Sequence, residues 1–112
     1  MENVMAKNFV QDGKTIPLVN GGASEILSGE PVPVGSLVVV AITDIAAGQT
    51  GDGFAEGVFL LPKLAADAIT AGEKVYLKDG LIQEEATDAV EAGIAWESAA
   101  AGVTVVEVKI NG

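Results

Sequence analysis

Residues 74–83 of the sequence read KVYLKDGLIQ, and this stretch indicates a β-hairpin. Apolar and polar side chains alternate along it, as they do in strands that are buried on one face only. Its centre, Asp79-Gly80, suits a two-residue type I′ turn, because both central residues of that turn need a positive φ. The stretch therefore predicts two short antiparallel strands and a fold that is built from hairpins.

A second stretch has the same arrangement. Residues 9–16 read FVQDGKTI, with Asp12-Gly13 at the centre, and they predict another hairpin. The two stretches look alike. Two hairpins that share one turn chemistry explain the likeness better than a duplicated domain, which is the alternative.

Residues 37–43, LVVVAIT, form a β-branched run without alternation. Such a run predicts a central strand that is buried on both faces. Pro31 and Pro33 precede it, and proline suits the start of a strand or the edge of a sheet. Residues 48–53, GQTGDG, predict a flexible loop.

The remaining segments are less uniform. Further strands are predicted at 58–61, closed by Pro62, and at 93–97 and 103–110, where the alternation slips near Val105-Val106 as in a β-bulge. Residues 64–71 predict the one helical turn. Residues 84–92 allow either a helix or, at Thr87-Asp88, a turn.

Together these segments predict an all-β protein. About seven to eight short strands with β-hairpins suggest a small single-domain sandwich or barrel with at most one or two short helical turns. We expect residues 1–5 to form a flexible N-terminal arm and residues 6–112 a single β domain.

The composition excludes many kinds of chemistry. The 112 residues include 6 Lys and 16 Asp or Glu, so the net charge is 6 − 16 = −10, and they include no Arg, His or Cys. Disulfides, catalytic triads and the usual zinc, copper and haem sites therefore lack their residues. The negative charge disfavours nucleic acid. The longest uncharged stretch, 31–43, holds two prolines and a glycine, so no membrane span is expected, and no signal peptide is visible.

The motifs that could carry chemistry are weak. Gly13-Lys14-Thr15 matches the end of a phosphate-binding loop, but Asn8 stands where the first glycine belongs and Pro17 follows, so a hairpin turn is favoured. The acidic residues are interpreted mainly as solvated surface; the alternatives are a weak divalent-ion site at Asp44 and Asp52, or glycosidase catalysis by two carboxylates. These acidic residues are Asp44, Asp52, Glu56, Glu84, Glu85, Asp88 and Glu91. No cofactor is expected.

Apart from Lys14, the lysines and the tryptophan lie outside these motifs. The six lysines are scattered, and solubility and protection of sheet edges are their expected roles. Trp96, the single Trp, is interpreted as a core residue rather than an interface anchor.

Several stretches resemble a family of small proteins from tailed phages and prophages, the DUF2190 family. The likeness runs in order through residues 5–13 (MAKNFVQDG), 20–23 (NGGA), 28–29 (SG), 34–38 (VGSLV), 41–48 (AITDIAAG), 56–63 (EGVFLLPK), 71–80 (AGEKVYLKDG), 93–97 (GIAWE) and 105–110. A recombinase function has sometimes been attributed to such proteins, but this chain has no complete phosphate-binding loop, no Arg and too few residues.

The resemblance implies a capsid decoration or cement protein. Such a protein is made in the bacterial host cytoplasm, binds the major capsid protein on the outer surface of the assembled head, and is typically a homotrimer without an active site. By its position in the chain, the segment Ala6, Lys7, Asn8 and Phe9 is the candidate capsid-contact arm, because chain ends can add to a sheet edge. The alternative is that Phe9 fills the core.

Two other functions remain as alternatives. One is a small β binding module of a tail, baseplate or host-surface complex. The other is a carboxylate enzyme, which requires a pocket that holds two carboxyl groups roughly 5–10 Å apart.

Overall fold

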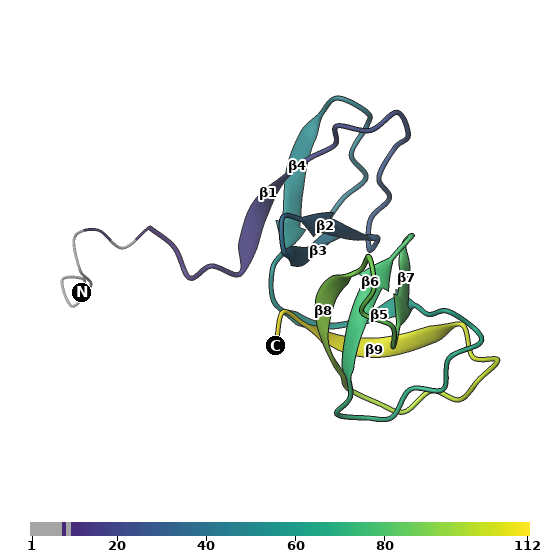
Figure 1. The fold of residues 1–112 in the computed structure, drawn as a ribbon. Helices are drawn as coiled ribbons and strands as arrows, with labels where there is room; N and C mark the ends of the chain where they lie inside the picture. Colours follow the sequence, from purple (N-terminus) through teal and green to yellow (C-terminus); the bar gives the residue numbers. More distant parts are fainter. Residues whose placement is uncertain (1–7, 9) are drawn as a thin grey trace.

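The computed structural model describes residue 8 and residues 10–112, and every regular element in this part of the chain is a β-strand (Figure 1). The strands are β1 (Thr15–Val19), β2 (Pro31–Val34), β3 (Leu37–Ala41), β4 (Thr50–Phe54), β5 (Gly57–Pro62), β6 (Lys74–Lys78), β7 (Leu81–Gln83), β8 (Val90–Ala95) and β9 (Val105–Ile110). They form two open antiparallel sheets, ordered β1-β4-β3-β2 and β5-β9-β8-β6-β7. The all-β prediction is confirmed, with nine strands.

The hairpin at residues 74–83 is confirmed as β6 and β7. Lys78 pairs with Leu81, so the connecting turn consists of two residues. These two, Asp79 and Gly80, have φ values of 54° and 77°, as a type I′ turn requires.

The central strand is confirmed as well. β3 lies inside the first sheet, and Val38 to Ala41 are all buried. β2, which contains Pro31 and Pro33, is an edge strand of that sheet, as the prolines predict.

The hairpin predicted at residues 9–16 is wrong for the part that is described. Residues 10–12 form no strand, although Gly13 does have a positive φ of 80°. β1 instead pairs with β4, where Thr15 faces Phe54. This long-range pairing prevails over the local turn signal because it buries Leu18 in the core.

The flexible loop predicted at 48–53 is wrong because most of it belongs to β4 in the sheet interior. Its glycines allow a close approach: a Cβ on Gly53 would lie 2.1 Å from Val39 Cγ1, and one on Gly51 would lie 2.8 Å from the Ile45 side chain. The glycines are there for packing and not for flexibility.

Three shorter segments differ in how far they match the prediction. Residues 64–71 contain a hydrogen-bonded turn, from Asp67 N to Leu64 O, and no helix. Thr87-Asp88 does form a turn. The bulge predicted near Val105 is wrong, since the register shift lies between β6 and β8 at Val75 and Tyr76.

The two sheets are built on one repeated pattern. β1, β2, β3 and β4 form a first unit, and their pairing order is repeated by β5, β6, β8 and β9 in a second unit, with β7 added at its edge. Each unit also has an isolated antiparallel bridge outside its strands, Ile26 with Ile45 and Ile69 with Ala99. The repeat does not relate the two Asp-Gly stretches to each other.

Hydrogen bonds at equivalent places support the repeat. Gly29 N donates to Ala41 O, and Gly72 N donates to Ala95 O. Beside each of these bonds a glutamate side chain closes a turn: Glu30 Oε1 accepts from Leu27 N, and Glu73 Oε1 accepts from Thr70 N. The chain thus folds the same four-stranded arrangement twice.

The core consists of two clusters of buried side chains. The larger cluster contains residues of the second unit together with Val38 and Val40 of β3. The smaller cluster contains Leu18, Val39, Ala41 and Ile45 and lies on the other face of the first sheet. The two sheets therefore share one hydrophobic cluster, through β3.

Candidate interaction surface

The predicted capsid-contact arm lies largely outside the described residues. This applies to Ala6, Lys7 and Phe9, while Asn8 is exposed. Residues 10–14 lead away from the sheets ahead of β1 (Figure 1), and the side chain of Val10 is 89% exposed. The described part of this segment is thus accessible to a partner.

A broad apolar surface lies on the side of the second sheet that faces away from the core. Leu60 on β5 is paired with Glu107 on β9, and Trp96 N donates to Glu107 O, so these three residues form a row across the sheet. A neighbouring row contains Val58, Lys109 and Ile94. We call this surface the outer face; it consists of Val58, Leu60, Pro62, Ile94, Trp96, Val105, Glu107 and Lys109.

The largest side chains of the outer face are exposed. Leu60 is 61% and Trp96 is 53% exposed, and Lys109 Nζ lies 5.6 Å from the centre of the Trp96 ring. The interpretation of Trp96 as a core residue is wrong. Ala95 points into the core and is buried, so the next residue along the extended chain points outward.

Few features of the sequence point to this surface. Residues 58–61, VFLL, predict a strand, but they are apolar at every position and so do not indicate which of its faces is exposed. The alternation in β9, with buried Val106 and Val108 and outward Glu107 and Lys109, is the signal that locates the outer side.

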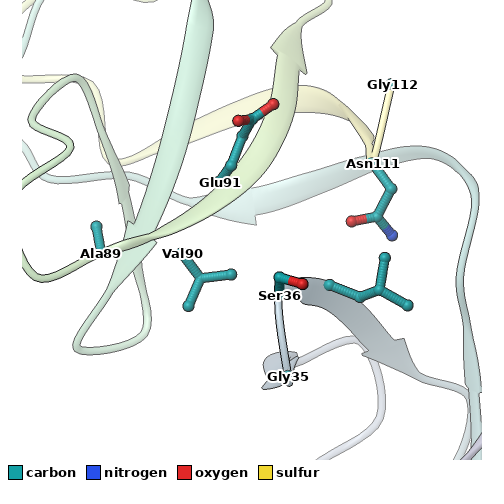
Figure 2. Close-up of a pocket in the computed structure, with 8 residues that line it drawn as sticks. Gly35, Ser36, Ala89, Val90, Glu91, Asn111 and Gly112 are labelled. Atoms are coloured by element: carbon teal, nitrogen blue, oxygen red, sulfur yellow. The ribbon is translucent and has the colours of Figure 1, made fainter.

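A cavity of about 510 Å³ lies where the two units meet (Figure 2). Its lining residues are Gly35, Ser36, Leu37, Ala89, Val90, Glu91, Asn111 and Gly112, among which Glu91 has the only ionisable side chain. The Asn111 amide is already bonded, since Nδ2 donates to Val38 O and Ala55 O and Oδ1 accepts from Val38 N. The pair of carboxyl side chains that a glycosidase needs is therefore missing from this cavity.

The carboxylates that do interact lie on the surface. A hydrogen bond with Glu84 lowers the pKa of Glu73, and the same bond, with the charges of Glu73 and Asp67, raises the pKa of Glu84. Hydrogen bonds from Thr87 lower the pKa of Glu85. Among residues 8 and 10–112, no group of three or more acidic side chains is arranged to hold a metal ion.

The other predicted sites are not brought together. Asp44 Oδ1 accepts a hydrogen bond from Ser28 N, while Asp52 lies exposed on β4. Gly13-Lys14-Thr15 leads into β1 and not into a helix, so the row of amide donors that holds a phosphate is missing there.

Two buried polar residues were missed by the sequence interpretation. Lys63 follows β5 and is 2% exposed, and its Nζ donates to Leu64 O and Val103 O. Asn20 follows β1 at the equivalent place, and its Nδ2 donates to Ser24 O and Ile45 O. Lys63 was expected at the surface, but its ammonium group satisfies loop carbonyls inside the second unit.

The sequence profile of the phage cement proteins matches residues 10–110, from the segment ahead of β1 to the end of β9. The chain belongs to the phage cement protein family. The resemblance to the DUF2190 family, an earlier name of the same family, is thereby confirmed. No curated protein and no solved structure gave a match.

Membership in this family establishes the general role of the protein. This cement protein is a structural, non-enzymatic phage protein that stabilises the capsid. It binds the capsid, and its location is therefore the virion. In the described part of the chain, no helix has the length and apolar character to cross a membrane.

Proposed function

We propose that this cement protein is a homotrimer that binds the major capsid protein on the outer surface of the assembled head and braces the shell against internal DNA pressure. The family match over residues 10–110 is the observation that carries the proposal. The all-β body supports it, because a brace needs rigid packed sheets and no reaction centre.

The charge supports an outer position. The chain carries a net charge of −10, and most of its carboxylates are exposed. Close packing of such a surface against the genome inside the head would bring like charges together. An outer location avoids this repulsion.

The capsid contact is assigned to the N-terminal segment Ala6, Lys7, Asn8 and Phe9. The chain leaves the first sheet at β1, which is an edge strand, and residues 10–14 lead away from the body. An extended chain end that leaves a folded body in this way can add to a sheet edge of a partner.

Co-sedimentation with undecorated capsids of the parent phage tests this function. We expect saturable binding, and capsids that withstand a higher temperature before they release DNA. A variant with Phe9→Ala and Lys7→Ala should bind at least about tenfold more weakly while its circular dichroism spectrum stays unchanged.

Two outcomes would contradict the proposal. One is wild-type protein that ignores the shells, and the other is labelled protein that cryo-electron microscopy locates on the tail or baseplate instead of over the head. The second outcome would favour the tail or host-surface binding module.

A further inference from the structure

We propose that the outer face of the second sheet binds a second copy of this chain. This inference rests on the self-association in the proposed function and identifies the surface through which it occurs. It does not depend on the contact between the protein and the shell, which co-sedimentation with capsids measures separately.

The register of the two units shows which faces are equivalent. In the first unit, Phe54 on β4 is paired with Thr15 and with Val40, and in the second unit Lys109 on β9 is paired with Val58 and with Ile94. The row Thr15, Phe54, Val40, Pro31 therefore corresponds to the row Val58, Lys109, Ile94, Lys74.

In the first unit this face is covered by the second unit. Val40 is only 2% exposed, because it lies in the hydrophobic cluster that the second unit dominates. The Phe54 ring lies 5.4 Å from the ring of Phe59, a residue of the second unit. The fold thus already packs this face against a copy of the same four-stranded arrangement.

The equivalent face of the second unit has no such cover within the described residues. Val58, Lys74 and Lys109 of its row are exposed, and Ile94 is half-buried. Leu60 and Trp96 in the next row are exposed as well. Val58 and Val105 add further apolar area at 43% and 41% exposure. Monomeric proteins seldom leave a contiguous patch of this kind open, and a central Trp is a common interface anchor.

The charge of the outer face identifies the partner. Its charged residues are Glu107 and Lys109 and, at its edge, Lys74, whose Nζ lies 3.8 Å from Glu91 Oε2. The charges balance, so this face is locally neutral in a chain of net charge −10. Two such chains repel each other at most other places, and here they can meet without like charges in contact. Because the opposite charges are two residues apart on β9, Glu107 of one copy can lie beside Lys109 of the next copy around a ring.

A matched pair of leucine substitutions tests the inference. Leu60→Lys places a charge on the outer face, and Leu27→Lys places one on a loop of the first unit, where Leu27 is 54% exposed against 61% for Leu60. Sedimentation velocity over a dilution series gives the dissociation constant. We expect Leu60→Lys to weaken self-association roughly 30-fold or more, and Leu27→Lys to leave it within about threefold.

Trp96 provides a second measurement, because it is the only Trp in the chain. Its fluorescence maximum should shift to shorter wavelength as wild-type protein is concentrated, and should not shift in the Leu60→Lys variant. Circular dichroism shows whether both variants are folded.

The inference is overturned by wild-type protein that stays monomeric at all concentrations, or by Leu60→Lys protein that associates as wild type does. Neither result concerns the shell, because these assays contain no capsids. Failure of capsid binding, in turn, leaves the self-association measurements unchanged, so the two proposals can fail separately.

Discussion

At the scale of single residues, one glycine allows two strands to come closer than a side chain permits. Gly93 lies in β8 with a φ of 143°, and a Cβ there would be 2.0 Å from Lys109 O of β9. It lies at the β-bulge where the register between β6 and β8 shifts. The shape of the second sheet therefore depends on the absence of a side chain at this position.

Gly93→Ala should lower the free energy of unfolding by about 3 kcal/mol or more. Backbone atoms of β9 must move to make room for the Cβ, and alanine is strained at a positive φ. Gly29→Ala is the matched control, since Gly29 also has a positive φ but no atom within 4 Å of its Cβ position. That control should cost about 1 kcal/mol. Urea unfolding measures both, and equal losses would contradict the role of close packing.

The hydrogen bond between Glu73 and Glu84 predicts a pH effect. The raised pKa of Glu84 means that its contribution to stability is present below the ordinary value of 4.5 and is lost as the pH rises through its folded-state pKa. The lowered pKa of Glu73 contributes in the opposite sense, above 4.5, and is lost as the pH falls.

Glu84→Gln should therefore be more stable than wild type at about pH 7 and no more stable at about pH 4, since the amide keeps a donor for Glu73 at every pH. Thermal unfolding at the two pH values measures this difference. Glu91→Gln is the control, because Glu91 lies in a salt bridge with Lys74 and not in the carboxyl pair. A gain at pH 7 in both variants would indicate a general charge effect instead.

At the scale of single strands, β2 shows how a sheet edge is kept from pairing. The turn at Gly35-Ser36 has two residues and is flanked by Val34 and Leu37, so Val34 and Val32 direct their N–H groups to β3. Pro31 and Pro33 occupy the positions whose N–H groups would point outward. In the second unit the equivalent strand, β6, has no proline and pairs with β7 there.

Pro33→Ala should promote aggregation, because it adds an outward N–H group to an open edge. Light scattering at a temperature where the protein stays folded should rise severalfold faster than for wild type. Ser36→Ala is the control, because it changes an exposed side chain in the adjacent turn without adding a backbone donor. If both variants scatter alike, the prolines do not protect this edge.

The strands that the sequence predicts well have local signals. β6 and β7 follow from alternation and turn chemistry, and β3 follows from its β-branched run. β4 could not be found in this way, because its sequence, TGDGF, consists mostly of residue types that are common in loops. Its two glycines instead allow a close approach to Val39 and Ile45. Strand pairing at long range decides such a segment, and local propensity does not.

Most of the outer face could likewise not be predicted from the sequence. In the sequence, short matches of this repeat are ILSGE at 26–30 with ITAGE at 69–73, and AAG at 46–48 with AAG at 100–102. They gain meaning once the two bridges beside them are seen. Without the repeat, the exposed Leu60 and Trp96 read as ordinary core residues. The capsid-contact arm stays a prediction, since Ala6, Lys7 and Phe9 lie outside the described residues.

At the scale of the whole molecule, the two units are joined by the shared cluster and by one side chain. Asn111 follows β9 with a φ of 55°, and its amide bonds to both the N–H and the C=O of Val38. β4 does not extend far enough to pair with Val38, so the Asn111 side chain supplies the bonds that a strand residue would make. The end of the second unit therefore completes the first sheet.

Asn111→Ala should lower the free energy of unfolding by about 2 to 3 kcal/mol, because it leaves the Val38 backbone groups without partners. Asn111→Gly also lacks the amide, but glycine is not strained at a positive φ. It should therefore be only about 1 kcal/mol more stable than Asn111→Ala. Hydrogen exchange at the Val38 amide should be faster in both variants. Unchanged protection of that amide would contradict the role of Asn111.

The repeat has a consequence for synthesis on the ribosome. The first unit emerges before the second, so Val38, Val40 and Phe54 reach solvent before the residues that cover them have been translated. During that interval the nascent chain presents an apolar sheet face, a natural target for chaperones. The prolines of β2 act then as well, because they keep this half-made sheet from pairing with another nascent chain.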